Sequence, residues 1–173
     1  KTLLILSLFS VLSSAAHAAH SQLISMETQY FTKDLPEAIA LKATPKSLNK
    51  MVWDENKNIL LVKEDGVYEF ITIIQYGIKE TAETSGNIYY WLEVDEAPLL
   101  ETVQFVSVPL QTKTNLMRFD SALPVKAGSQ IRFMFSSTSP DIGLLSFSPT
   151  ELNPSVASVT MSVFKIGNIV TYL

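Results

Sequence analysis

The stretch from Asp65 to Gly77 constrains the fold most, because it reads as a strand with two apolar faces. Asp65-Gly66 is a turn signal, Gly77 closes the run, and the residues between them are mostly β-branched or aromatic. Read at a period of two, the faces are Val67, Glu69, Ile71, Ile73 and Gln75 on one side and Tyr68, Phe70, Thr72, Ile74 and Tyr76 on the other. A strand with one solvated face would alternate between apolar and polar residues. We therefore expect the chain's own core to cover one face and a second copy of the chain to cover the other.

A second stretch, Ile88 to Val94, has the same property. Tyr89 and Trp91 lie on one face, and Tyr90, Leu92 and Val94 lie on the other. Two such strands in one small domain predict a buried contact between subunits. The sequence leaves open which face makes this contact. The candidates for the interface are Tyr68, Phe70, Ile71, Ile73, Tyr76, Tyr89 and Trp91.

Short strand-like runs recur along the rest of the chain, separated by turn residues and with little room for helices. They are residues 51–53, 59–62, 102–108, 116–119, 131–135, 144–147 and 156–166. Serial strands of this kind predict an antiparallel β-sandwich or barrel. Residues 19–49 are harder to interpret. Residues 27–32 fit a first strand, and residues 34–37 resemble a helical capping box. The alternation of Ile39, Leu41 and Ala43 nevertheless favours a short edge strand or an irregular arm over a helical turn.

The N-terminal segment has the pattern of a secretory signal peptide. Lys1 precedes an apolar run, and small residues lead to Ala16-His17-Ala18. The apolar run is too short for a membrane span, which needs roughly 20 residues. We therefore expect cleavage after Ala18 and a secreted or extracytoplasmic protein. The predicted organisation is a signal peptide (1–18), an N-terminal arm with the first strand or strands (19–50), a jelly-roll domain (51–167) and a C-terminal tail (168–173).

Composition excludes several classes of function. The formal net charge is −4, with no basic cluster, and nucleic-acid binding needs a basic stripe. The chain has no cysteine, so its stability cannot come from disulfides. Its two histidines, His17 and His20, lie before residue 21. A Ser-His-Asp or Cys-His site therefore cannot be assembled within residues 21–173.

Five segments together resemble the tumour necrosis factor and complement globular-head superfamily, in the style of its single-domain bacterial and viral members. Gly66-Val67-Tyr68-Glu69-Phe70 matches the family's G-x-Y-x-F strand. Residues 128–131 resemble its G-D-x-I motif, with Ser129 where Asp is usual, and residues 154–166 resemble its closing strand. Residues 53–54 and 87–94 complete the likeness. The resemblance implies a ten-strand jelly roll, a compact homotrimer and a binding role without catalysis or cofactor. It does not imply a particular ligand, because partner choice in this superfamily lies in variable loops.

Two further groups of residues leave alternatives open. Glu93, Asp95, Glu96 and Glu101 are oxygen donors of the kind that Ca²⁺ takes, but charges at a strand end also deter edge pairing. We therefore predict no metal site and no cofactor. The aromatic residues Trp53, Tyr89, Tyr90 and Trp91 could stack on a sugar ring, or could fill the core or the subunit contact.

The sequence thus favours a secreted, non-enzymatic binding or surface-interaction module that forms a TNF-like homotrimer. Its partners are further copies of itself and an extracellular protein or glycan, with no nucleic acid and no membrane span in the mature chain. A carbohydrate-binding β-sandwich is the alternative binding function. A glycosidase that uses two carboxylates is the alternative enzyme.

Overall fold

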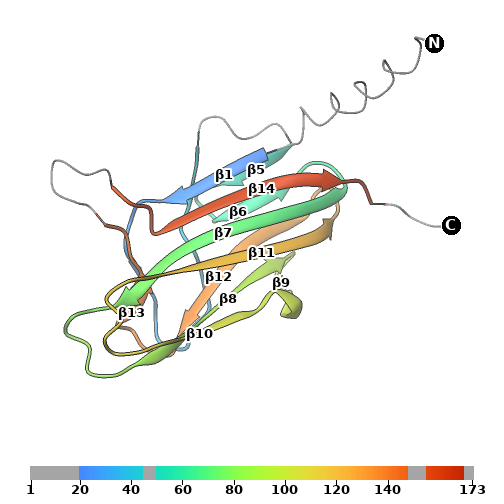
Figure 1. Cartoon of the computed structure of the whole chain (residues 1–173). Helices are drawn as coiled ribbons and strands as arrows, with labels where there is room; N and C mark the ends of the chain where they lie inside the picture. The colour runs from blue at the N-terminus through green and yellow to red at the C-terminus, as the bar shows by residue number, and fades with distance from the viewer. Residues whose placement is uncertain (1–19, 45–49, 148–154, 170–173) are drawn as a thin grey trace, which may run out of the picture.

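The computed structural model describes residues 20–44, 50–147 and 155–169, and in these the chain folds into two antiparallel sheets packed face to face (Figure 1). We call them the β7 sheet and the β8 sheet. The β7 sheet contains β1 (His20–Ser25), β2 (Gln29–Tyr30), β4 (Lys42–Ala43), β7 (Gly66–Ile78), β11 (Asn115–Val125), β13 (Ile142–Leu144) and β14 (Val159–Gly167). The β8 sheet contains β3 (Glu37–Ala38), β5 (Met51–Asp54), β6 (Ile59–Val62), β8 (Gly86–Val94), β9 (Ala97–Pro98), β10 (Gln104–Val108) and β12 (Gln130–Ser137). The predicted all-β sandwich is confirmed.

The β7 strand is the centre of its sheet. It pairs with β11 along one side and with β14, then β13, along the other. The β14 strand pairs in turn with β1, which pairs with β4. In the second sheet the order is β10-β8-β12-β6-β5. A single 3₁₀ turn, η2 (Leu100–Thr102), is the one helical element of the described residues, and none of their helices is long and apolar enough to cross a membrane.

The core lies between the sheets and combines aliphatic side chains with several large aromatic ones. Tyr68 and Phe70 of β7 are fully buried, and the Phe70 ring lies 6.1 Å from that of Phe133 in β12. Tyr90 of β8 is also fully buried and meets the Phe119 ring edge-on at 4.8 Å. Each inward row alternates with an outward row on the same strand, which is the pleat of a packed sandwich.

The N-terminal arm contains a strand that the sequence did not indicate. His20–Ser25 forms β1, inside the β7 sheet between β14 and β4. Its inward side chains are Ser21, Leu23 and Ser25, so only one of the three is apolar and the period-two signal is weak. The capping-box pattern does not begin a helix. Glu37 lies in β3, and its Oε1 accepts a hydrogen bond from the backbone N–H of Thr32.

Some strand boundaries differ from the predicted ones, at a sheet edge and at turns. The β11 strand runs through Pro124 to Val125, and proline is tolerated because the outer side of β11 has no partner strand among the described residues. The run predicted over 102–108 begins with the η2 turn, and the last strand starts at Val159 rather than Val156. The predicted signal peptide, residues 1–18, lies outside the described residues.

Candidate functional site

The seven predicted interface residues fall into three groups. Tyr68 and Phe70 have no exposed area in the protomer, and Tyr76 retains 5%. These three side chains belong to the core between the sheets, so a partner could not touch them. The outward row of β7 contains Ile71 and Ile73, while Tyr89 and Trp91 lie on the outward face of the other sheet and are half-buried.

The outward face of the β7 sheet has an apolar centre. Ile73 is 44% exposed, and its neighbours across the sheet are Thr160 of β14 and Arg118 of β11. Ile24 of β1 lies beyond Thr160 in the same row. In the described residues no other element covers this row, so an isoleucine stands in water at the middle of a sheet. An uncovered apolar centre of this kind is typical of a surface that binds something.

Polar and aromatic side chains surround this centre. Ile71 lies between Ser162 and Asp120, and the Nε of Arg118 donates to Oδ2 of Asp120 at 2.9 Å. At one end of the sheet, the His20 ring stacks on that of Phe164 with centroids 4.6 Å apart. The face therefore combines an apolar middle with polar side chains and a stacked aromatic pair around it.

The outward face of the β8 sheet carries the second surface, a groove. Its walls are almost wholly apolar, and the one side-chain hydroxyl besides that of Tyr89 belongs to Ser136. Beside the groove, the Tyr89 ring lies 5.4 Å from that of Phe105, which is exposed. The groove is lined by Pro36, Tyr89, Trp91, Pro98, Leu100, Val103 and Ser136.

Of the four aromatic residues considered for sugar stacking, only Tyr89 and Trp91 reach this groove. Tyr90 is fully buried in the core, and the Nε1 of Trp53 donates to the backbone oxygen of Leu41 at 3.0 Å from a buried ring. The indole Nε1 of Trp91 is buried and has no hydrogen-bond partner in the described residues.

The carboxylates around Asp95 interact with cationic or N–H groups of the protein itself. Arg132 Nη1 donates to Oε1 of Glu93 at 3.0 Å, and its Nη2 lies 3.8 Å from Oε1 of Glu96. Asp95 Oδ1 accepts the backbone N–H of Gln130 at 2.8 Å. These carboxylates therefore already have cationic or N–H partners. Across residues 20–44, 50–147 and 155–169, no group of three or more His, Asp or Glu side chains is arranged to hold a metal ion.

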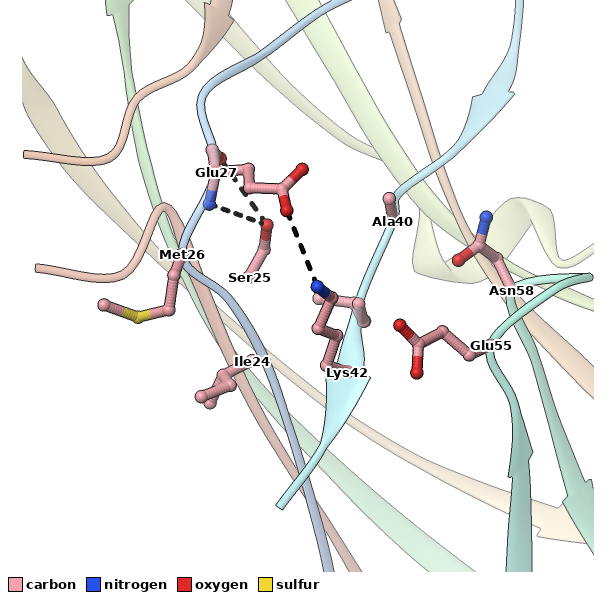
Figure 2. A pocket seen from close by; sticks show the side chains of 9 residues that line it. Ile24, Ser25, Met26, Glu27, Ala40, Lys42, Glu55 and Asn58 are labelled. Carbon is pink, nitrogen blue, oxygen red and sulfur yellow. Dashed lines mark hydrogen bonds and ion pairs between the residues drawn. The ribbon is translucent and has the colours of Figure 1, made fainter.

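A small pocket lies at the opposite edge of the sandwich and was not anticipated. It is formed by the end of β1, the approach to β4 and the turn between β5 and β6, as Figure 2 shows. Its lining consists of Ile24, Ser25, Met26, Glu27, Ala40, Leu41, Lys42, Glu55 and Asn58. The sequence contains no local signal for this pocket, because three separate segments supply its walls.

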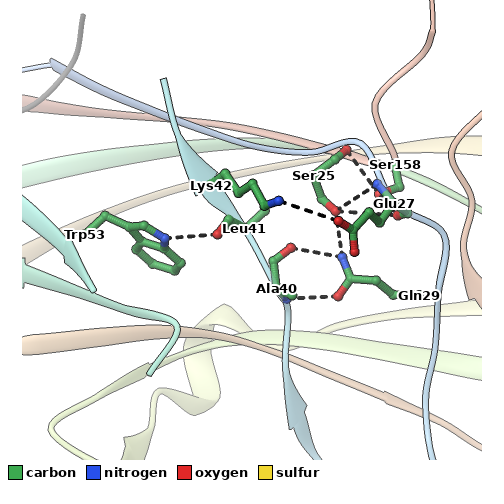
Figure 3. Close-up of polar contacts among 8 residues, drawn as sticks. All are labelled: Ser25, Glu27, Gln29, Ala40, Leu41, Lys42, Trp53 and Ser158. Carbon is green, nitrogen blue, oxygen red and sulfur yellow. Dashed lines mark hydrogen bonds and ion pairs between the residues drawn. The ribbon is translucent and has the colours of Figure 1, made fainter. Parts of the chain in front are cut away.

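Side-chain hydrogen bonds brace the walls of this pocket (Figure 3). Gln29 pairs with Ala40 as a strand would: its Nε2 donates to the Ala40 oxygen at 3.0 Å, and its Oε1 accepts the Ala40 N–H at 2.9 Å. The Ser158 hydroxyl donates to the backbone oxygen of Glu27 at 2.7 Å. Side chains thus replace the ladder hydrogen bonds that the irregular backbone lacks here.

No protein-family model matches the sequence, and a search of characterised proteins finds no match. Solved structures do match the fold. The Eiger TNF of S. frugiperda superposes with a TM-score of 0.60 at 15% identity, covering 89% of this chain and 96% of that one. The crystal structure of murine APRIL at pH 5.0 superposes with a TM-score of 0.53 at 9% identity, covering 87% of this chain and 100% of that one. The protein therefore has a TNF-like jelly-roll fold, as the resemblance implied, although the described residues form fourteen strands rather than ten.

Proposed function

We propose that the protein is a secreted, non-enzymatic binding or surface-interaction module that assembles as a homotrimer through the outward face of the β7 sheet. The observation that carries this proposal is the uncovered centre of that face, where Ile71 and Ile73 lie without a covering element among the described residues. Fully burying an exposed large apolar side chain contributes about 1.5–3 kcal/mol. Ile73 is 44% exposed, so its burial would contribute a part of that in each of the three protomers. We choose threefold symmetry because the resemblance to the tumour necrosis factor superfamily implies a homotrimer, and the sheet face alone would not specify the symmetry.

The proposal of a binding role also rests on the chemistry of the side chains. The mature sequence has no cysteine, and its one histidine, His20, stacks on Phe164 at the surface. The best acidic group is engaged by Arg132 and a backbone N–H, which leaves no free pair of carboxylates there for glycoside hydrolysis. Secretion is part of the proposal because of the signal-peptide pattern that ends at Ala18.

The experiment that tests the assembly is light scattering coupled to size-exclusion chromatography on residues 19–173. We expect the mass of three chains at micromolar concentration. A monodisperse monomer would overturn the trimer. Mass spectrometry of the secreted protein tests the signal peptide separately, with Ala19 expected as the first residue.

Carbohydrate binding is a second candidate, favoured by the placement of Tyr89 and Trp91 side by side in an open groove. Aromatic rings at alternate strand positions offer a platform for a sugar face. A sugar also needs hydrogen bonds to its hydroxyls, and here only Tyr89 and Ser136 offer side-chain hydroxyls. A glycan array probed with the wild type and Trp91→Ala tests this candidate. Binding that Trp91→Ala abolishes would establish it, and an array without signal would eliminate it.

A further inference from the structure

The pocket beside β4 has a lining whose charges are incompletely paired. Lys42 lies between two carboxylates and pairs with one of them, since its Nζ is 3.6 Å from Oε1 of Glu27. Glu55, across the pocket, has no hydrogen bond or ion pair within the described part of the chain. The side-chain amide of Asn58, from the same turn, also lacks a partner there. With two carboxylates and one ammonium group, the lining has a net charge of −1, which favours a cationic occupant.

Apart from Ser25, the rest of the lining is apolar. Ile24 and the half-exposed thioether of Met26 form one wall, and Ala40 closes the other side (Figure 2). A purely ionic ligand, such as a hydrated metal ion, would leave this surface uncovered. A cation carried on an aliphatic stem would cover it, because such side chains pack their methylene groups on apolar surface and keep the charge at the rim.

The size of the pocket restricts the occupant further. Its volume is about 230 Å³, below the roughly 300–1,000 Å³ of sites that enclose a small-molecule ligand. One long side chain fits this space. Among cationic side chains, the planar guanidinium has the fork of N–H donors that matches a carboxylate and a nearby amide oxygen together.

We propose that this pocket binds the side chain of an arginine presented by a partner protein. The guanidinium pairs with the Glu55 carboxylate and donates to Oδ1 of Asn58, while the methylene stem packs on Ile24 and Met26. The Glu27–Lys42 pair stays intact and closes the rim. This inference deepens the proposed binding function by naming the chemistry of a partner. The pocket lies within one protomer, but its wall residue Ile24 also belongs to the outward row of the β7 sheet, so the two proposals are tested separately below.

Amide chemical shifts of the ¹⁵N-labelled mature protein test the proposal. The probe is a blocked tripeptide with arginine in the middle, and the comparison is the same peptide with citrulline, which has the same shape without the charge. We expect saturable shifts at Ile24, Met26 and Asn58 with the arginine peptide only. Glu55→Gln should weaken the affinity about three- to fivefold, the size of a solvent-exposed ion pair.

Glu101→Gln is the matched control, because Glu101 is also exposed and lies in the η2 turn, which follows β9 of the β8 sheet. It should leave the affinity unchanged. Equal shifts with the citrulline peptide, shifts confined to other residues, or an affinity unaffected by Glu55→Gln would overturn the arginine pocket. The titration is repeated on the Ile73→Asp variant. Both proposals expect this variant to be a monomer that still binds the arginine peptide. A wild type that binds the peptide as a monomer would overturn the trimer alone, and a trimeric wild type that does not bind it would overturn the arginine pocket alone.

Discussion

The phenol of Tyr90 in one sheet donates a buried hydrogen bond of 3.1 Å to the hydroxyl of Thr72 in the other. It joins β8 to the centre of β7 across the core, where both side chains are fully buried. A polar pair in this position favours one alignment of the two sheets, because another alignment would leave each group buried without a partner.

The Tyr90–Thr72 pair predicts a measurable coupling between two substitutions. Thr72→Val should lower the free energy of unfolding by about 1–3 kcal/mol, because it leaves the phenol buried without an acceptor. Adding Tyr90→Phe should recover part of this loss, since the unpaired group is then removed as well. Urea denaturation of the two single variants and the double variant measures the coupling. Strictly additive effects would show that the hydrogen bond contributes nothing specific.

Alkaline pH should destabilise the protein through the same residue. Burial raises the pKa of Tyr90 well above its usual value, and the hydrogen bond to Thr72 offsets this only in part. Because the pKa is higher in the folded state, the contribution of Tyr90 is complete below pH of about 10 and is lost as pH rises beyond that value. The expected loss approaches about 1.4 kcal/mol per pH unit.

Urea denaturation at pH 8, 10 and 11 tests this dependence. Tyr90→Phe is the control and should show a shallower decline above pH 10. Burial also raises the pKa of Tyr68, so some decline should remain in the variant. A wild type and a Tyr90→Phe variant with the same alkaline slope would contradict the prediction.

Ile73→Asp should dissociate the proposed assembly without unfolding the protomer. Ile73 is 44% exposed, so the protomer can keep the aspartate in water, whereas an interface would remove the charge from water, and the neighbouring Arg118 already pairs with Asp120. Light scattering should report a monomer, and circular dichroism should retain the β-sheet spectrum. Val52→Asp is the matched control, because Val52 is 36% exposed on β5 of the other sheet and should leave the mass unchanged. Equal dissociation by both variants would argue against the β7 sheet as the interface.

Two glycines should differ in how well they tolerate alanine. A Cβ at Gly77 would overlap the backbone oxygen of Lys113 and the side chain of Leu145. Gly77→Ala should therefore lower the free energy of unfolding by at least about 2 kcal/mol. A Cβ at Gly167 would have its nearest neighbour, Val67 Cβ, at 4.0 Å, so Gly167→Ala should change stability by less than about 0.5 kcal/mol. Thermal denaturation ranks the two. A tolerated Gly77→Ala would mean that the crossing of β7 and the residues before β11 is looser than described.

Much of the fold could be predicted because short stretches of sequence specify many of its strands. The β6 strand appears where the sequence indicated it, at Ile59–Val62, since an apolar β-branched run between turn residues has few other conformations. The long strand after Asp65-Gly66 was visible for the same reason. The strand at His20–Ser25 was not visible in the sequence. It buries two serines, so its own residue pattern is weak, and pairing with the neighbouring strand stabilises it.

The candidate surfaces depended more heavily on tertiary structure. The sequence showed that β7 and β8 each have two apolar faces, since alternation along a strand is a local property. It could not rank those faces, because Tyr68 and Ile71 are both apolar enough for a core. Packing of the two sheets decides which face is buried. Tyr68 and Phe70 fill the space between the sheets, and Ile71 and Ile73 lie on the outer surface. The pocket at Glu55 was decided entirely by tertiary structure, because residues from three distant segments meet there only after the edges of both sheets have come together.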